Sequence, residues 1–467
     1  MTNNHPKREN KMGTMPINKL LINMSVPMMI SMLVQSLYNI VDSVFVAQIG
    51  EKALTGVSLA FPVQTLMIAL GVGSGVGINA LISRRLGQHR YEDANQTADN
   101  GIFINVLHFL IFVVFGLLFV QTFFSAQTTD SEIIAHGSDY LEIITIFSLG
   151  KYMQITFERL LQSTGLTFYS MISQASGAII NIILNPIFIF GFLGVPAMGT
   201  RGAAIATVIG QSLAAMLGLY FNLRYNKDLK LSLQKFRPSL TIIKDIYSIG
   251  IPSTMMMAIG SFVNLAMNNI LIAFSSTATA VFGVYFRLQS VVFMPVFGMN
   301  NGMVPIIGYN FGARQPNRIK AVIKLGVKYA VIVMAIGLVV FQLFPEQLLS
   351  LFNASEEMYV IGVPALRIIS LHYIAAGVSI VLGSVFQAFG FGKYSLFVSM
   401  TRQVLVLLPV AYAMSLTGNL NNIWWAYVIS EGFSLALSLY FMIRINKNEI
   451  EPLYEEEENI LSTERNK

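Results

Sequence analysis

The chain has 467 residues, of which 54% are hydrophobic and only 12% are charged, and its mean hydropathy is +0.62. Soluble globular proteins carry about 25% charged residues, so this chain lacks the polar side chains that a water-facing surface needs. The composition therefore excludes soluble enzymes, nucleic-acid-binding proteins and disordered proteins. Because backbone polar groups in lipid must be satisfied internally, the predicted fold class is an all-α integral membrane bundle.

The two ends of the chain differ in charge. Residues 1–19 form a basic segment that leads into a long apolar stretch without a cleavage site, so we expect no removable signal peptide. The other end, from Glu455 onward, is expected to be a solvated, disordered acidic tail. The chain has no cysteine, which excludes disulfides and thiolate metal sites.

About twelve apolar stretches reach the roughly 20 residues that a bilayer-spanning helix needs. The predicted spans are 20–48, 54–82, 98–124, 138–161, 168–193, 200–223, 247–275, 280–308, 320–345, 360–388, 395–416 and 422–445. Arginine and lysine are concentrated in the second, sixth and eighth connections and are nearly absent from the alternate ones. The positive-inside rule then predicts that both termini are cytoplasmic.

The sequence repeats itself at an offset of about 225 residues. The pattern Q-x-x-G-x-x-x-Y-S begins at Gln162 and again at Gln387. An even number of spans per repeat preserves orientation, so the halves are related by a pseudo-two-fold axis along the membrane normal, as in many transporters. The predicted domains are a cytoplasmic segment (1–19), an N-terminal six-helix lobe (20–223), a basic cytoplasmic linker (224–246), a C-terminal six-helix lobe (247–446) and an acidic cytoplasmic tail (447–467).

Several motifs resemble those of one transporter family. They are Pro27-Met28-Met29-Ile30, Tyr38-Asn39-Ile40-Val41-Asp42, Gly56-Val57-Ser58, Arg84-Arg85-Leu86-Gly87, Gly298-Met299-Asn300-Asn301-Gly302 and Tyr309-Asn310-Phe311-Gly312. Over about residues 15–447 the chain resembles the multidrug and toxic compound extrusion (MATE) family, in its prokaryotic DinF- and MepA-like branch. The resemblance implies a two-lobed, twelve-helix antiporter of the plasma membrane that exports drugs and organic cations against inward H⁺ or Na⁺.

Asp42 is the first candidate for ion coupling, because it is the only charged residue between Lys19 and Glu51. A carboxyl group deep in a span costs roughly 2.5–3.5 kcal/mol, which favours a functional reading. Burial favours its protonated form, and its ionised form can hold Na⁺; alternatively it is a structural acid that is hydrogen-bonded to helix neighbours. The resemblance also implies that this aspartate couples ions. Gln35 and Asn39 are predicted to share its helix face.

Further polar residues are predicted around Asp42. Asn181 and Asn185 form an i, i+4 pair before Pro186, and Thr207 is expected to add a hydroxyl group. These amides are predicted to supply the remaining hydrogen bonds of Asp42. Alternatively, they form structural hydrogen bonds between helices. Related exporters often have Asp where this chain has Asn185, so this lobe has one carboxylate fewer.

Two other acids are candidates for secondary protonation. Glu158 lies at a predicted span end beside Arg159, where a local ion pair is the alternative. Glu431 lies deeper, in the twelfth predicted span. Arg402 is expected to be paired or to reach a span end.

The predicted substrate cavity is rich in methionine, whose adaptable side chain suits varied ligands. Its predicted residues are Met28, Met32, Met257, Asn264, Asn268 and Met294. No P-loop is present, and the glycines at 71–77 follow no strand, so no nucleotide site is predicted.

The predicted function is secondary active export of amphipathic or cationic small molecules by alternating access. No cofactor is expected beyond H⁺ or Na⁺, and no metal beyond Na⁺ at Asp42. The expected partners are such substrates and the lipid bilayer, without nucleic acid, and the protein is expected to be a monomer. The alternatives are a lipid-linked oligosaccharide flippase and, from another class, a membrane enzyme or channel.

Overall fold

The computed structural model describes residues 10–231 and 236–456 of the chain. The outer parts of the predicted terminal segment and tail, at 1–9 and 457–467, and residues 232–235 of the predicted linker lie outside this described part. Every regular element in the described part is helical. This agrees with a chain whose backbone must satisfy its own hydrogen bonds in lipid.

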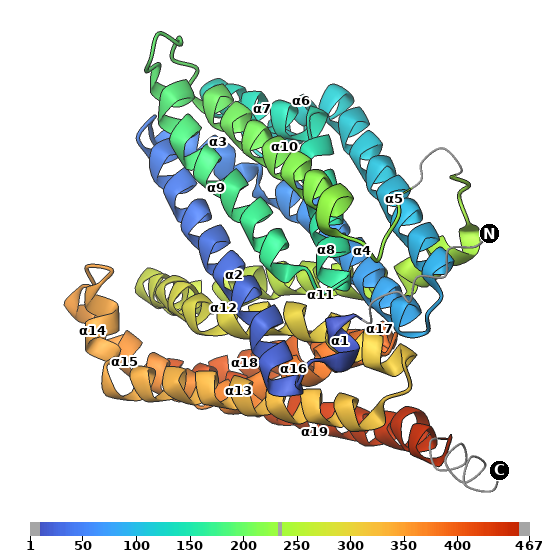
Figure 1. The fold of residues 1–467 in the computed structure, drawn as a ribbon. Helices are drawn as coiled ribbons and strands as arrows, with labels where there is room; N and C mark the ends of the chain where they lie inside the picture. Colours follow the sequence, from blue (N-terminus) through green and yellow to red (C-terminus); the bar gives the residue numbers. More distant parts are fainter. Residues whose placement is uncertain (1–9, 232–235, 457–467) are drawn as a thin grey trace, which may run out of the picture. The chain divides into compact units, whose positions relative to one another are not determined.

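Figure 1 labels the helices in chain order. Those before the middle of the chain are α1 (Lys11–Thr14), α2 (Ile17–Ala47), α3 (Glu51–Leu59), α4 (Phe61–Gly87), α5 (Tyr91–Leu118), α6 (Val120–Ser125), α7 (Ser131–Ile146), α8 (Leu149–Ser163), α9 (Thr167–Phe190) and α10 (Thr200–Tyr225). The remaining ones are α11 (Leu240–Ile272), α12 (Ser276–Gly312), α13 (Pro316–Leu343), α14 (Pro345–Ser350), α15 (Glu356–Ser370), α16 (Tyr373–Ala388), α17 (Gly392–Met400), the π-helical η2 (Thr401–Leu407), α18 (Leu408–Ser415), α19 (Leu420–Ile445) and the π-helical η3 (Asn446–Ile450).

The helices are consistent with the predicted twelve membrane spans. Within the described part, ten helical segments are long and apolar enough to cross a bilayer, and the pair α15 and α16, bent by 49°, makes an eleventh when counted as one span. The predicted fourth span, 138–161, falls on α7 and α8, which are interrupted at residues 147–148. The predicted fold class is confirmed. One difference is that the predicted span 54–82 is divided, because α3 ends at Leu59, is capped by Ala60, and is followed by α4 from Phe61.

The chain packs as two compact units that exchange short segments. Unit 1 comprises the described residues up to Val26, the turn Ser83–Arg90 and the described residues from Ile259 onward. Unit 2 comprises Pro27–Ile82 and the described residues of Tyr91–Ala258. Helix α2 therefore changes unit at Pro27, and α11 does so after Ala258. The predicted domain boundaries follow the sequence repeat and stay a prediction.

The repeated Q-x-x-G pattern has a clear structural cause. Gly165 between α8 and α9 has φ +86°, and Gly390 between α16 and α17 has φ +91°. In each turn the glycine nitrogen donates to the glutamine carbonyl three residues earlier, at 3.0 Å, as at other helix ends that turn through a left-handed residue. Glycine adopts this conformation without the steric cost of a Cβ atom, so the same turn is built once in each unit.

Unit 2 is held together by close helix packing and an aromatic core. A Cβ atom on Gly177 would lie 2.7 Å from the carbonyl oxygen of Gly210, and one on Gly210 would lie 2.6 Å from that of Gly177. Helices α9 and α10 therefore run side by side at backbone distance (Figure 1). Phe112, Phe124 and Tyr152 belong to the buried core of the same unit.

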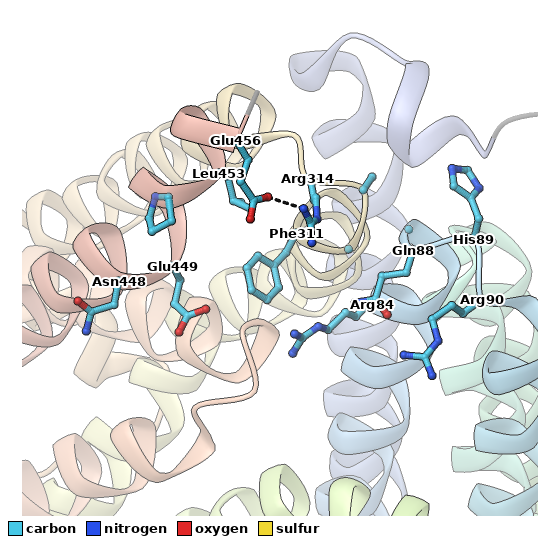
Figure 2. A pocket seen from close by; sticks show the side chains of 14 residues that line it. Arg84, Gln88, His89, Arg90, Phe311, Arg314, Asn448, Glu449, Leu453 and Glu456 are labelled. Carbon is cyan, nitrogen blue, oxygen red and sulfur yellow. Dashed lines mark hydrogen bonds and ion pairs between the residues drawn. The ribbon is translucent and has the colours of Figure 1, made fainter. Parts of the chain in front are cut away.

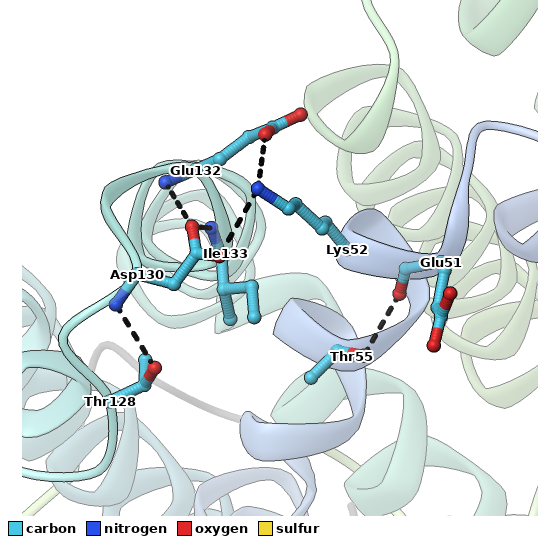
Figure 3. A network of polar contacts seen from close by, with 7 residues as sticks. All are labelled: Glu51, Lys52, Thr55, Thr128, Asp130, Glu132 and Ile133. Atoms are coloured by element: carbon cyan, nitrogen blue, oxygen red, sulfur yellow. Dashed lines mark hydrogen bonds and ion pairs between the residues drawn. The ribbon is translucent and has the colours of Figure 1, made fainter.

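A surface network joins α3 to the start of α7 in unit 2 (Figure 3). Lys52 Nζ lies 3.1 Å from Asp130 Oδ2 and 2.7 Å from Glu132 Oε2. Asp130 also caps α7, because its Oδ1 accepts the backbone N–H of Glu132 at 2.9 Å. The hydrogen bond from Lys52 holds the pKa of Asp130 below its ordinary value. The hydrogen bond to Glu132 raises the pKa of Lys52.

Both ends of the described chain dock on unit 1. The guanidinium of Arg318 donates to the carbonyl oxygens of Met12 and Met15, each at 2.9 Å, which satisfies the end of α1. Helix continues through η3 to Glu456, so the start of the predicted disordered tail is helical. The hydroxyl group of Tyr454 donates to Asn317 Oδ1 at 3.0 Å, which holds this extension on unit 1.

Candidate ion-coupling site

The candidate site is built around Asp42 in unit 2, on the part of α2 that follows Pro27. The Asp42 side chain is partly buried, and its Oδ1 accepts a hydrogen bond from Asn185 Nδ2 on α9 at 2.8 Å. Pro186 follows Asn185 directly and has no backbone N–H. The helix therefore lacks one backbone hydrogen bond beside the site. The partner that donates to the carboxyl group is thus a neutral amide.

The hydrogen bonds continue from Asn185 along α9 and on to α10. Asn185 Nδ2 also donates to Asn181 Oδ1 at 2.9 Å, and Asn181 Nδ2 donates to Thr207 Oγ1 on α10 at 3.0 Å. The i, i+4 spacing places both amides on one face of α9. The structure therefore brings together Asp42, Asn181, Asn185 and Thr207, all predicted from the sequence. Their roles in coupling stay a prediction.

Two predicted members of the site form a separate pair. Gln35 Nε2 donates to Asn39 Oδ1 at 3.3 Å, and Gln174 Nε2 of α9 donates to Gln35 Oε1 at 3.3 Å. Asn39 itself is exposed. Helical spacing predicted the face of α2 that these residues share with Asp42, but their hydrogen bonds lead to one another and to Gln174.

The site also includes two tyrosines that were not predicted from the sequence. The hydroxyl group of Tyr38 lies 3.5 Å from Thr207 Oγ1, and it is within electrostatic reach of Asp42. Tyr140 of α7 is buried and is also within electrostatic reach of Asp42. Tyr38 precedes Asp42 by four residues, a spacing that could have found it. Nothing in the sequence near Tyr140 points to α2.

The two further acids have different partners. Glu158 Oε1 accepts from Gln154 Nε2 at 2.9 Å, whereas its neighbour Arg159 donates to Gln162 Oε1 at 2.9 Å. In unit 1, Glu431 is 3% exposed, and its Oε2 lies 3.5 Å from Nη1 of Arg402. Arg402 is presented by the π-helical segment η2, a type of local distortion often found at functional positions.

The predicted cavity residues are divided between the units. Met28, Met32 and Met257 belong to unit 2, and Asn264, Asn268 and Met294 belong to unit 1. Met28 is buried, and the other five are half-buried. Their role in substrate binding stays a prediction.

The donor atoms around Asp42 are carboxylate, amide and hydroxyl oxygens. A carboxyl group can bind H⁺, and oxygen ligands of this kind suit hard cations such as Na⁺. Asn185 Oδ1 is buried and has no hydrogen-bond partner within the described part of the chain, so one further oxygen is available beside the carboxylate. No group of three or more His, Asp or Glu side chains in the described part is placed to hold a metal ion.

The comparison with protein families decides the identity of the chain. The family model MatE matches residues 27–187 and again residues 252–413, so the matched regions start 225 residues apart and cover most of the protein. The chain belongs to the MatE family. A MatE protein is a transporter and not an enzyme, and the match in both halves accords with the predicted two-lobed fold.

Relatives of this MatE protein are similar along nearly their whole length. The chain is 26% identical over 427 residues to the multidrug export protein MepA of Staphylococcus haemolyticus strain JCSC1435, covering 91% of this chain and 93% of that protein. It is 25% identical, with a TM-score of 0.88, to a MATE protein crystallised in complex with MaL6, covering 96% and 99% of the two chains. It is 26% identical, with a TM-score of 0.86, to a MOP superfamily transporter from Pyrococcus furiosus Vc1 (DSM3638), covering 94% and 98%.

Proposed function

We propose that this protein is a secondary active multidrug exporter that moves amphipathic and cationic compounds out of the cell in exchange for inward H⁺ or Na⁺. The similarity to MepA proteins supports the substrate class. The observation that carries the coupling scheme is the partly buried Asp42, which accepts a hydrogen bond from the neutral amide of Asn185. A neutral donor leaves the carboxyl group able to change charge without stranding a buried cation.

The proposed cycle uses one carboxyl group. From the outside, H⁺ or Na⁺ reaches Asp42 and neutralises it, which weakens the attraction for a cationic substrate, and the substrate leaves. The transporter then opens inward, the ion dissociates, and a new substrate binds to the site with ionised Asp42. Asn181, Asn185 and Thr207 hold the carboxyl group in place, and Tyr38 extends this chain of contacts.

The energetics limit what a single carboxyl group can drive. One pH unit supplies about 1.4 kcal/mol, and about 100 mV supplies roughly 2.3 kcal/mol per charge moved. Exchanging one H⁺ for one monovalent cation moves no net charge, so only the pH gradient drives it. We therefore expect a cation gradient of about tenfold per pH unit.

The location of the protein, its oligomeric state and its substrate contacts are also proposed. We propose that the protein lies in the plasma membrane with both termini in the cytoplasm, on the basis of its lysine and arginine distribution, and that it works as a monomer. Substrate is proposed to contact Met28, Met32 and Met257 of unit 2 and Asn264, Asn268 and Met294 of unit 1. Secondary protonation at Glu158 and Glu431 stays a prediction.

The test is dye export from liposomes that contain the purified protein, driven separately by an imposed H⁺ gradient and an imposed Na⁺ gradient. The wild-type protein should export a cationic dye under at least one gradient. Asp42→Asn should export at the rate of protein-free liposomes under both. Asp139→Asn is the matched control, because Asp139 belongs to the same unit and is engaged at the surface by Arg201 at 2.7 Å. Gradient-driven export by Asp42→Asn at the wild-type rate would refute the scheme.

A further inference from the structure

Helices α4 and α12 end in the same turn, although the two motifs that form it differ. After Arg84–Gly87, the N–H of His89 donates to Leu86 and that of Arg90 to Arg85, at 3.0 and 2.9 Å. After Tyr309–Gly312, the N–H of Arg314 donates to Phe311 and that of Gln315 to Asn310, at 3.2 and 2.9 Å. His89 and Arg314 both adopt a left-handed backbone, with φ +57° and +55°, at a cost of roughly 1–2 kcal/mol each for a residue with a Cβ atom.

The two helix ends cross at backbone distance inside unit 1. A Cβ atom on Gly87 would lie 1.9 Å from the carbonyl oxygen of Tyr309, and one on Gly312 would lie 2.0 Å from that of Arg84. The contact is reciprocal: each glycine meets the first residue of the other motif. Gly87 and Gly312 are 225 residues apart, as are His89 and Arg314, so the crossing pairs equivalent positions of the two repeats.

Because of the crossing, a turn of the first repeat packs in unit 1, together with most of the second repeat. Residues Ser83–Arg90 pack in unit 1, whereas α4 up to Ile82 and α5 from Tyr91 pack in unit 2. Beyond the glycines, the Arg84 guanidinium lies 4.7 Å from the centre of the Phe311 ring. Figure 2 shows these two side chains beside the Arg314–Glu456 ion pair. They line a cavity of about 630 Å³ whose charged lining marks a water-facing end of the unit.

The same two helices each hold the beginning of another long helix through a glycine. In unit 1, a Cβ atom on Gly302 of α12 would lie 2.8 Å from the carbonyl group of Met24 in α2. In unit 2, a Cβ atom on Gly77 of α4 would lie 2.3 Å from the carbonyl oxygen of Ile246 in α11. Gly77 and Gly302 are again 225 residues apart. By the proposed topology, these helix beginnings and the ends of α4 and α12 all face the cytoplasm.

We propose that the crossing at Gly87 and Gly312 closes the cytoplasmic side of the transporter, and that these two glycines position that closure. When the cytoplasmic side opens, the Ser83–Arg90 turn leaves unit 1 and the crossing separates. Glycine suits this role because two backbones that meet without interlocking side chains separate and re-form without rearranging rotamers. The inference rests on the family identity and on the proposed cytoplasmic orientation, and it requires neither a particular substrate nor a particular coupling ion.

The first test uses glycine-to-alanine substitutions with a cysteine reporter, which is clean because the chain has no cysteine of its own. Ser25→Cys supplies the reporter thiol: Ser25 is 4% exposed in unit 1 and donates to the carbonyl oxygen of Met299 beside Gly302. Gly87→Ala and Gly312→Ala should each favour the separated state, so that a membrane-impermeant maleimide applied to the cytoplasmic side labels the reporter thiol about tenfold faster, in keeping with the strain of an overpacked contact. Both should also slow export.

Two controls separate this effect from general damage. Gly283→Ala lies on the same helix α12, where an added Cβ atom would meet nothing within 4 Å, so it should leave labelling and export unchanged. Lys227→Cys, at an exposed position, should be labelled at one rate in every background. Unchanged labelling of the reporter thiol in both crossing variants, or faster labelling only from the outer side, would overturn the inference.

A second variant tests the closure without altering either glycine. Ideal Cβ atoms on Gly312 and Gly87 would lie 3.1 Å from the backbone nitrogen of Gln88 and 2.9 Å from that of Ala313. In the double variant Gln88→Cys and Ala313→Cys, a short, cleavable bifunctional thiol reagent should therefore join the two helix ends. Complete cross-linking should stop export, and cleavage should restore it, while either single cysteine treated alike should export normally. Export at the full rate by the completely cross-linked protein would also overturn the inference.

Discussion

The two units each contain an acid in a membrane-spanning helix, but the groups facing these acids differ. In unit 2, Asp42 accepts a hydrogen bond from the neutral Asn185 at 2.8 Å. In unit 1, Glu431 faces the guanidinium of Arg402 at 3.5 Å, and His372 is within electrostatic reach of both. Unit 1 therefore sets its buried acid against a cation, whereas unit 2 sets its acid against a neutral amide.

The comparison teaches that duplication of a fold does not duplicate its chemistry. The repeat preserves the Q-x-x-G turns and the glycine contacts, which depend on backbone shape. It does not preserve the charged site, which depends on individual side chains. The proposed coupling through Asp42 therefore belongs to unit 2, and Glu431 of unit 1 is tested separately below.

The largest expected difference in coupled export is between the variants that neutralise Asp42 and Glu431. Asp42→Asn should abolish gradient-driven export, whereas Glu431→Gln should keep the same number of coupling ions per substrate even if less protein folds. The check is ion-to-substrate stoichiometry in liposomes, normalised to folded protein. A lower stoichiometry in Glu431→Gln would move part of the coupling to unit 1.

Removing the cation of unit 1 should mainly affect stability. Arg402→Gln leaves the buried Glu431 without its partner at 3.5 Å, and because the Arg402 side chain is partly exposed we expect a loss of about 1–3 kcal/mol. Arg402→Gln combined with Glu431→Gln should recover much of that loss. Thermal unfolding in detergent measures both variants. Equal destabilisation by the single and the double substitution would show that the pair is not coupled.

Adding a second carboxyl group should change how unit 2 responds to voltage. Asn185→Asp places another acid beside Asp42, and a second coupling ion per cation exported would make transport electrogenic. A membrane potential of about 100 mV would then add roughly 2.3 kcal/mol of driving force. Export measured with and without an imposed potential tests this. If Asn185→Asp responds to potential no more than wild type does, the added acid carries no ion.

The surface network of Lys52 offers the smallest effect, and its sign follows from the two pKa shifts. Asp130 has a lowered pKa, so its contribution to stability is present above its ordinary value of 3.8 and is lost as the pH falls through the folded value. Lys52 has a raised pKa, so its contribution is complete below 10.5 and is lost as the pH rises through the folded value. Lys52→Ala should therefore lower the unfolding temperature slightly between these limits and not outside them. A pH-independent difference would contradict this linkage.

Much of the fold could be predicted from the sequence, because lipid imposes span length and internal hydrogen bonding. The division of the second span at Ala60 was missed because the apolar pattern of residues 54–82 continues through the interruption. Asp42, Asn181, Asn185 and Thr207 could be predicted because each polar side chain stands out in an apolar helix. The partner of Glu431 could not, because Arg402 lies on another helix and its direction depends on the π-helical segment η2.

The most direct test of the central claim is ion release from the purified protein when substrate binds. H⁺ release is measured with a pH dye in weak buffer, and Na⁺ release is measured as displacement of radioactive Na⁺. The account predicts that wild-type protein releases one coupling ion for each cationic substrate bound, and that Asp42→Asn releases none. Release of the same number of ions by both proteins would contradict the claim that Asp42 carries the coupling ion.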